Sequence, residues 1–188
     1  EEFFINDLNS TWRDVKTWGN YAYVTTEADA GLLIVDLSDM TGNTYYHRTL
    51  FSAATTGADM EFTAAHNIYI DEQGVAYIFG ASSNTGSNPA DGAIFLDVNA
   101  HATAPEYLGE WDDEYIHDGM VRGDTMYAGC IYTGELYVVD VSNKSNPITI
   151  GTHLTPNAFT HNAWVSGDGD FVFTTDEQSD AYLAAYDI

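Results

Sequence analysis

The amino-acid sequence predicts an all-β protein that folds as a β-propeller of four-stranded antiparallel blades. Self-similar units recur at a spacing of 44 to 51 residues between equivalent histidines, which is the period of propeller blades. β-Branched and aromatic residues fill short runs that Gly, Asn and Asp interrupt. No segment keeps a sustained apolar period of about 3.6 residues, so we expect strands and turns with almost no helix.

Each of the four units opens with a basic side chain and an Asx residue, followed by a turn and an aromatic or apolar strand. The openings read "RDVKT" from Arg13, "HNIYI" from His66, "HDGMV" from His117 and "HNAWV" from His161. After a variable loop, each unit reaches an apolar strand that ends in aspartate, namely "LLIVDLS", "AIFLDVN", "LYVVDVS" and "LAAYDI". The second and third units continue into "APEYLGEW" and "NPITIGTH", and "TYYHRTLF" is expected to do the same job in the first.

The units define one domain, residues 1–188, with approximate boundaries 11–55, 64–111, 115–155 and 159–188. The last unit stops after a third strand, whereas residues 1–8, "EEFFINDL", match a fourth. A propeller can close its ring when an N-terminal strand completes the last blade, because closure removes exposed strand edges. We therefore expect residues 1–8 to complete either the last of four blades or another blade of a larger ring.

The charge of the chain excludes some partners. Five basic residues against 29 acidic ones leave a formal charge of −24, which would repel a phosphate backbone and disfavours anionic membranes. No stretch is apolar for long enough to insert into a membrane. Acidic loops attract divalent cations, so Ca²⁺ is a possible ligand of these loops, and such a surface suits a saline exterior.

Two sets of motifs resemble known families. "LLIVDLS" and "LYVVDVSNKSNP" resemble the LVIVD repeat of bacterial surface proteins. The ordered set "TWRDVKTWGNYAYV", "AHNIYID", "YIHDGMV" and "THNAWVSGDGDFVFTTDE" resembles the choice-of-anchor B family of secreted proteins. This resemblance implies a β-propeller that is exported to the cell surface or the medium. It implies no reaction, so an enzyme is not the first expectation.

The Asx position is filled in every unit, by Asp14, Asn67, Asp118 and Asn162. Asx side chains commonly bond to their own backbone two residues further on. Presence in all four units is what a structural role predicts, and we expect these residues to be turn devices.

The preceding position holds Arg13, His66, His117 and His161. Because the first strand of each blade lines the central channel, we expect the three imidazoles to ring one mouth of it. Three imidazoles can hold zinc or copper and leave an open coordination position. Two alternatives stay open: each histidine bonds only to local backbone, or Arg13 and partly protonated histidines form an anion pocket.

Three carboxylates follow equivalent second strands and can lie beside this ring, namely Glu27, Asp176 and Glu177. In that position they would orient the imidazoles, or act as a general base. The alternative is that they are exposed acidic residues in a chain rich in them.

These observations allow three functions. The first is a secreted or cell-surface binding module, for an unidentified surface ligand or protein partner, with a metal at the channel mouth. The second is a metal-dependent extracellular enzyme, hydrolytic or oxidative. The third is a subunit of an extracellular assembly, in which the histidine ring is only scaffolding. The fold alone does not decide among them.

Overall fold

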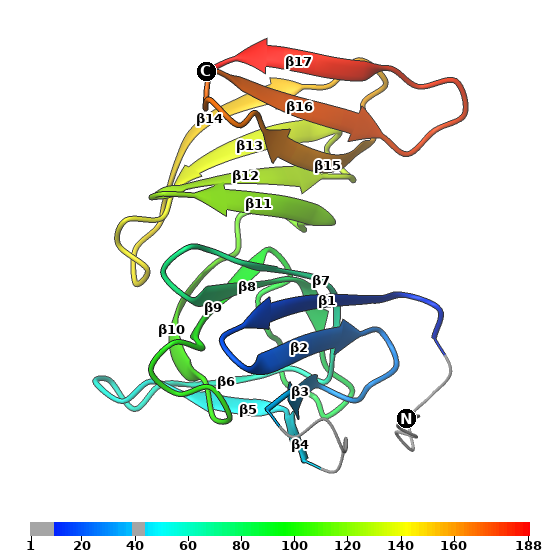
Figure 1. Cartoon of the computed structure of the whole chain (residues 1–188). Helices are drawn as coiled ribbons and strands as arrows, with labels where there is room; N and C mark the ends of the chain where they lie inside the picture. The colour runs from blue at the N-terminus through cyan, green and yellow to red at the C-terminus, as the bar shows by residue number, and fades with distance from the viewer. Residues whose placement is uncertain (1–9, 39–43) are drawn as a thin grey trace.

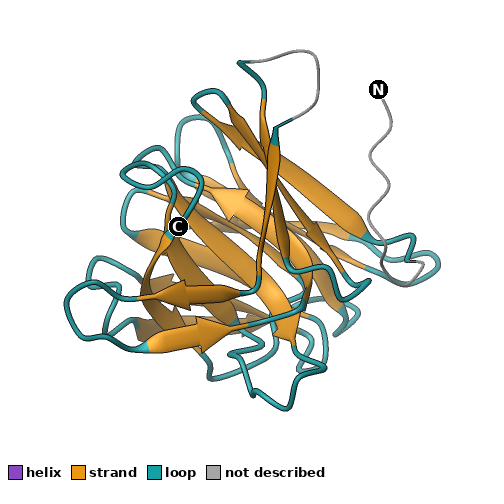
Figure 2. Ribbon diagram, turned by 90° about the horizontal axis from the view of Figure 1, so that it is seen from below, coloured by secondary structure: helices purple, strands orange, loops and turns teal. Residues whose placement is uncertain are grey.

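The computed structural model describes residues 10–38 and 44–188. This part of the chain forms 17 β-strands and contains no helix, and hence none that could cross a membrane. Four antiparallel sheets follow one another as the blades of a β-propeller (Figure 1). Figure 2, which is coloured by secondary structure, shows only strands and loops in the described part of the chain. The predicted fold class is confirmed.

Each blade is built from strands that pair in sequence order. Blade 1 contains β1 (Arg13–Trp18), β2 (Tyr21–Thr26), β3 (Leu32–Asp36) and β4 (Tyr45–Arg48). Blade 2 contains β7 (Ala64–Ile70), β8 (Val75–Ser82), β9 (Ala93–Asp97) and β10 (Glu106–Trp111). Blade 3 contains β11 (Asp118–Arg122), β12 (Thr125–Cys130), β13 (Glu135–Asp140) and β14 (Ile148–Leu154). Blade 4 contains β15 (Thr160–Val165), β16 (Phe171–Asp176) and β17 (Leu183–Asp187).

Each sequence unit thus contains one blade, with one difference in the strands. The run "TYYHRTLF" forms β4 and then leaves blade 1 as β5 (Leu50–Ser52), which pairs with β6 (Asp59–Glu61) in a separate two-stranded sheet. The chain turns away because Phe51 is buried and stacks on Phe62, with ring centroids 5.1 Å apart. The strand expected in residues 1–8 lies outside the described residues.

The core consists of apolar layers between neighbouring blades, and one aromatic position recurs in it. Tyr23, Tyr77 and Tyr127 occupy the same place in β2, β8 and β12. Each belongs to the apolar cluster between its own blade and the next one. All three are at most 9% exposed. Burial of one large apolar side chain contributes roughly 1.5–3 kcal/mol, so this position fixes the stacking of the blades.

The first strands of successive blades lie side by side and form a continuous wall where the blades meet. β1 contacts β7, β7 contacts β11, and β11 contacts β15. Residues at one phase of the repeat therefore gather at one level of this wall, as the sequence periodicity predicts.

Candidate metal centre

The three histidines of the repeat form a continuous row of rings. His66 lies in β7, His117 directly precedes β11, and His161 lies in β15. The ring centroids of His66 and His117 are 4.0 Å apart, and those of His117 and His161 are 4.5 Å apart. Residues far apart in the sequence thus meet because their blades repeat in step.

A carboxylate stands near each end of the row. Glu27 follows β2, and its Oε1 lies 2.5 Å from Nδ1 of His66. Glu177 follows β16, and its Oε2 lies 3.9 Å from Nε2 of His117. The His66 and His117 side chains are each 13% exposed, whereas Glu27 is 36% exposed and Glu177 58%. The site is therefore a shielded row of imidazoles with two more open acidic groups.

The hydrogen bond of His117 determines which of its nitrogens can accept a cation. Nδ1 of His117 lies 3.3 Å from the backbone carbonyl oxygen of His161. A carbonyl oxygen only accepts, so Nδ1 carries the proton and the lone pair remains on Nε2. This lone pair faces Glu177 at 3.9 Å, which is beyond hydrogen-bond reach. An imidazole lone pair and a carboxylate oxygen are both electron-pair donors of the kind that a divalent metal accepts.

The surroundings of His117 keep its imidazole neutral. Burial, and then the neighbouring His66 and His161, lower the pKa of His117 from 6.5 to about 4. A metal ligand must be the neutral imidazole, so protons compete little with a metal at neutral pH. The same low pKa disfavours the anion-pocket alternative at this position, because a neutral ring offers no positive charge.

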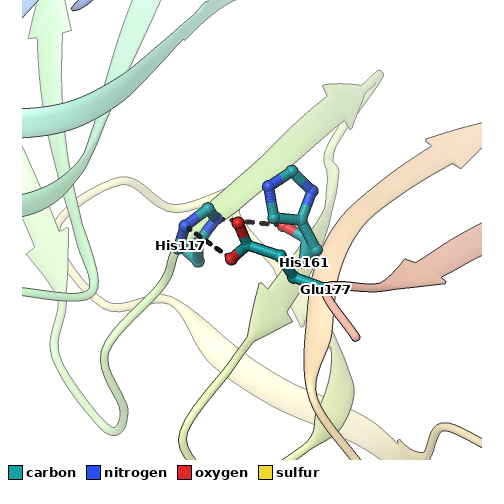
Figure 3. A group of neighbouring side chains, drawn as sticks. All are labelled: His117, His161 and Glu177. Atoms are coloured by element: carbon teal, nitrogen blue, oxygen red, sulfur yellow. Dashed lines mark hydrogen bonds and ion pairs between the residues drawn. The ribbon is translucent and has the colours of Figure 1, made fainter. Parts of the chain in front are cut away.

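One group of ligand atoms converges more closely than the rest. One donor atom each from His117, His161 and Glu177 lie within 4.8 Å of one another. Figure 3 shows the Glu177 carboxylate directed at the His117 ring, with the His161 ring beside it. Two ligands at about 2.1 Å from zinc are at most about 4.2 Å apart, so small side-chain movements suffice for coordination.

The sequence suggested His66 as a metal ligand, but the structure places its ring beside the converging ligand atoms. It is not one of the three converging ligands, and its Nδ1 is engaged by Glu27. A carboxylate that holds one imidazole nitrogen orients the ring, as it does beside many metal sites. Glu177, expected to orient the imidazoles or to act as a general base, places a carboxylate oxygen in the converging set.

Asp176 and Arg13 are not brought to the converging ligands. Asp176 is 7% exposed, and its carboxylate accepts hydrogen bonds from Thr155 Oγ1 at 2.5 Å and from the backbone N–H groups of Asn157 and Phe159 at 3.0 Å. It therefore organises the turn before β15, which corrects the role expected from its sequence position. Arg13 donates a hydrogen bond to the carbonyl oxygen of Ser10.

The four Asx residues also differ from expectation, because they lie in or at the start of the inner strands and not in turns. Oδ1 of Asp14 and of Asp118 each accepts a hydrogen bond from the next backbone N–H, at 2.7 Å. Nδ2 of Asn162 donates to Oδ2 of Asp118, which links blades 3 and 4. Side chains of an extended strand project from the sheet, so Asp118 and Asn162 of neighbouring blades can bond to each other.

Tyr115 is a wall residue that the sequence patterns did not single out. A Cβ added to Gly80 would lie 2.9 Å from the Tyr115 hydroxyl oxygen and 3.0 Å from His66 Cβ. Gly80 therefore permits the ring of Tyr115 to approach His66, and its φ of +61° also favours glycine. Two features of the sequence could have identified Tyr115: its position two residues before His117, and the glycine in β8, Gly80.

The comparisons with known proteins agree with this architecture. The family model of the LVIVD repeat matches residues 11–44 and 121–155. The chain is thus a β-propeller in which two segments match the LVIVD repeat. A search of the curated proteins finds no match.

Solved structures resemble the chain in fold. A putative 6-phosphogluconolactonase from Bacteroides uniformis matches with a TM-score of 0.61 and 15% identity, over 93% of this chain and 52% of that one. The β-propeller domain of Cps50 (Swd1) from Myceliophteria thermophila matches with a TM-score of 0.54 and 11% identity, over 89% and 54%. At such identities the likeness concerns the fold alone. The chain spans about half the length of both structures.

Proposed function

We propose that this chain acts outside the cell or at its surface as a binding module of the choice-of-anchor B type. In this proposal the mouth of the channel holds a divalent transition metal, zinc or copper, that recruits the ligand. The observation that carries the proposal is the convergence of His117, His161 and Glu177. The LVIVD repeats and the strongly acidic composition support an exported propeller.

The chemistry of the donors fits such a metal. Two imidazoles and one carboxylate form a ligand set that zinc accepts, and three protein ligands leave one position open. In this arrangement His117 contributes Nε2, because its Nδ1 donates to the His161 carbonyl oxygen. A donor atom of a bound partner, such as a carboxylate or an imidazole, would fill the open position.

The test measures metal binding directly. Elemental analysis of the purified protein and calorimetric titration with Zn²⁺ and Cu²⁺ should give one site per chain. His161→Ala and Glu177→Gln should each weaken binding by at least about tenfold, since loss of a group that merely orients a ligand already costs 10- to 100-fold. His101→Ala is the matched control, because His101 is exposed and lies in a distant loop. A wild-type chain that binds neither ion would overturn the proposal, and so would unchanged affinity in His161→Ala.

A metal-dependent extracellular enzyme, hydrolytic or oxidative, is the second candidate. The observation in its favour is the His66–Glu27 pair, with an imidazole whose ring centroid lies 4.0 Å from that of His117. Such a pair can accept a proton from water in the open position. Turnover of ester, lactone or phosphoester substrates that Glu27→Gln abolishes, while metal affinity stays unchanged, would favour the enzyme over the binding module.

A further inference from the structure

Two tyrosines lie beside the row of histidines. Tyr132 is in the loop between β12 and β13 and is 77% exposed. Its ring centroid is 4.9 Å from that of Tyr115, and the two ring planes are inclined by 40°. Tyr115 in turn approaches His66, because both residues have atoms about 3 Å from the place of a Cβ on Gly80. We refer to Tyr115 and Tyr132 as the tyrosine pair.

The repeat does not explain an exposed aromatic ring at the position of Tyr132. Tyr132 is the second residue after β12, and the second residues after β2 and β16 are Ala28 and Gln178. The same loop is thus formed in other blades without an aromatic side chain. A ring that is 77% exposed also stabilises the core little, since the gain follows the apolar area removed from water. What this side chain offers is an accessible aromatic face for a ligand.

The loop that carries Tyr132 is held firmly by its backbone. The N–H group of Gly134 donates to the carbonyl oxygen of Cys130 at 2.9 Å and closes the turn. The N–H group of Thr155 donates to the carbonyl oxygen of Gly134 at 3.0 Å and ties the loop to the segment before β15. A Cβ on Gly134 would lie 2.4 Å from the backbone of Ala158, so the two segments are tightly packed. A ligand that stacks on this ring therefore does not have to order the loop first.

Carboxylates make the surroundings of the tyrosine pair negative. Burial, and then Tyr132, Glu27 and Asp91, raise the pKa of Tyr115 above its ordinary value, so both carboxylates lie within electrostatic reach of its hydroxyl group. An ionised carboxylate only accepts hydrogen bonds. A complementary ligand therefore donates hydrogen bonds and carries positive charge.

The cations of the chain itself already have partners. Each of the five lysine and arginine side chains donates to an acceptor within the chain. In chain order these donors are Arg13, Lys16, Arg48, Arg122 and Lys144. The formal charge of −24 thus remains to attract a cationic partner and to speed its encounter with the protein.

We propose that the tyrosine pair binds an arginine side chain of a protein partner. A guanidinium group is planar and always charged, stacks on aromatic faces and offers five N–H donors to carboxylates. Tyr132 supplies the open face, and Glu27 and Asp91 supply acceptors near Tyr115. The inference rests on the proposed binding function, since the partner whose donor atom fills the open metal position also brings the arginine.

A neutral sugar would also stack on an exposed tyrosine, but the charges do not favour it. A sugar gains nothing from the long-range field of a chain with a charge of −24. Its hydroxyl groups need donors as well as acceptors, and Glu27 and Asp91 offer acceptors only. The charge and the acceptors therefore favour a guanidinium group over a sugar.

The first experiment measures the binding of a defined cationic probe in the presence of a chelator, so that no metal takes part. The probe is an acetylated and amidated tetra-arginine peptide, titrated by calorimetry at about 0.15 M salt to screen long-range attraction. The wild type should bind this peptide more tightly than the tetra-lysine peptide, because a guanidinium group stacks on a ring and an ammonium group does not. The matching citrulline peptide, which has the same shape and no charge, should bind most weakly.

Variants test whether the ring of Tyr132 makes the contact. Tyr132→Ala should weaken arginine-peptide binding about three- to thirtyfold, as for the loss of one cation–π contact, and it leaves the charge of −24 unchanged. Tyr132→Phe keeps the ring and should retain wild-type affinity. Tyr45→Ala is the matched control, since Tyr45 is 48% exposed in the outer strand β4. Equal affinity of the wild type and Tyr132→Ala would overturn the inference. Tyr132-dependent binding of a neutral tetrasaccharide in place of the peptide would overturn it as well.

A zinc titration of the same variant separates this inference from the proposed metal centre. Tyr132→Ala should bind Zn²⁺ as tightly as the wild type, because Tyr132 is not one of the converging ligands. A protein that binds no metal but keeps Tyr132-dependent peptide binding would overturn the metal centre and support the arginine subsite. A protein that binds Zn²⁺ normally while its peptide affinity is indifferent to Tyr132 would overturn the subsite alone.

Discussion

Acidification of the metal-free protein should destabilise the native state through His117. Burial and the neighbouring His66 and His161 lower the pKa of His117 to about 4, against 6.5 for an ordinary histidine. Above pH 6.5 the ring is neutral in the folded and the unfolded chain. Between pH 6.5 and 4 the unfolded chain binds this proton and the native chain does not, so the free energy of unfolding falls as the pH falls.

The size of the effect follows from the two pKa values. A decrease from 6.5 to about 4 makes proton binding roughly 300-fold weaker, which corresponds to about 3 kcal/mol at about 1.4 kcal/mol per tenfold. The His117 side chain is only 13% exposed, so solvent screens this effect little. A change of this size is a large part of the stability of a typical domain.

Urea unfolding followed by tryptophan fluorescence, with a chelator present, measures this change between pH 7 and pH 4. Many carboxylates titrate in the same range, so the comparison is with His117→Gln, which cannot take up the proton. The wild type should lose about 3 kcal/mol more than His117→Gln over this interval. His47→Gln, at an exposed ring, serves as the control and should retain the wild-type pH dependence. Equal pH dependence of the wild type and His117→Gln would refute the reasoning.

Two further substitutions test the loops that hold the blades. Asp176→Asn should lower the free energy of unfolding by about 2–3 kcal/mol. The amide NH₂ of asparagine would face one of the backbone N–H groups that now donate to the carboxylate, so two donors would meet. Asp168→Asn, at an exposed aspartate, is the control and should change stability little in the same denaturation measurement. Gly134→Ala should cost more than about 2 kcal/mol, because its φ is +72° and its new Cβ would lie 2.4 Å from the backbone of Ala158. Gly123 also has a positive φ, +59°, but no atom lies within 4 Å of the Cβ that alanine would add, so Gly123→Ala should lower stability by only about 1 kcal/mol. Equal losses of stability in the two glycine variants would contradict the steric argument.

The fold and the row of histidines could be predicted from the sequence because both depend on periodicity. His66, His117 and His161 share one phase of the repeat, and stacked blades convert a common phase into spatial contact. The aromatic position of Tyr23, Tyr77 and Tyr127 follows the same rule, because each of them packs in the layer toward the next blade. A repeat therefore encodes three-dimensional neighbours directly.

The roles of neighbouring polar residues could not be predicted in the same way. Asp176 and Glu177 are adjacent in sequence, yet one is buried in a turn network and the other approaches His117. Successive side chains at a strand end point in different directions, and a register shift between Thr160 and Asn162 changes the local geometry further. Only the three-dimensional structure reveals which carboxylate faces the imidazoles.

The apolar layers between blades have a consequence for dynamics. Each layer joins only two adjacent sheets, so cooperativity passes from one blade to the next and has no common centre. Among the described residues, blades 2 and 3 pack against a neighbouring blade on both faces, whereas blades 1 and 4 each do so on one. Opening of one layer can therefore leave the next layer packed, and amide hydrogen exchange should report separate protection for each layer.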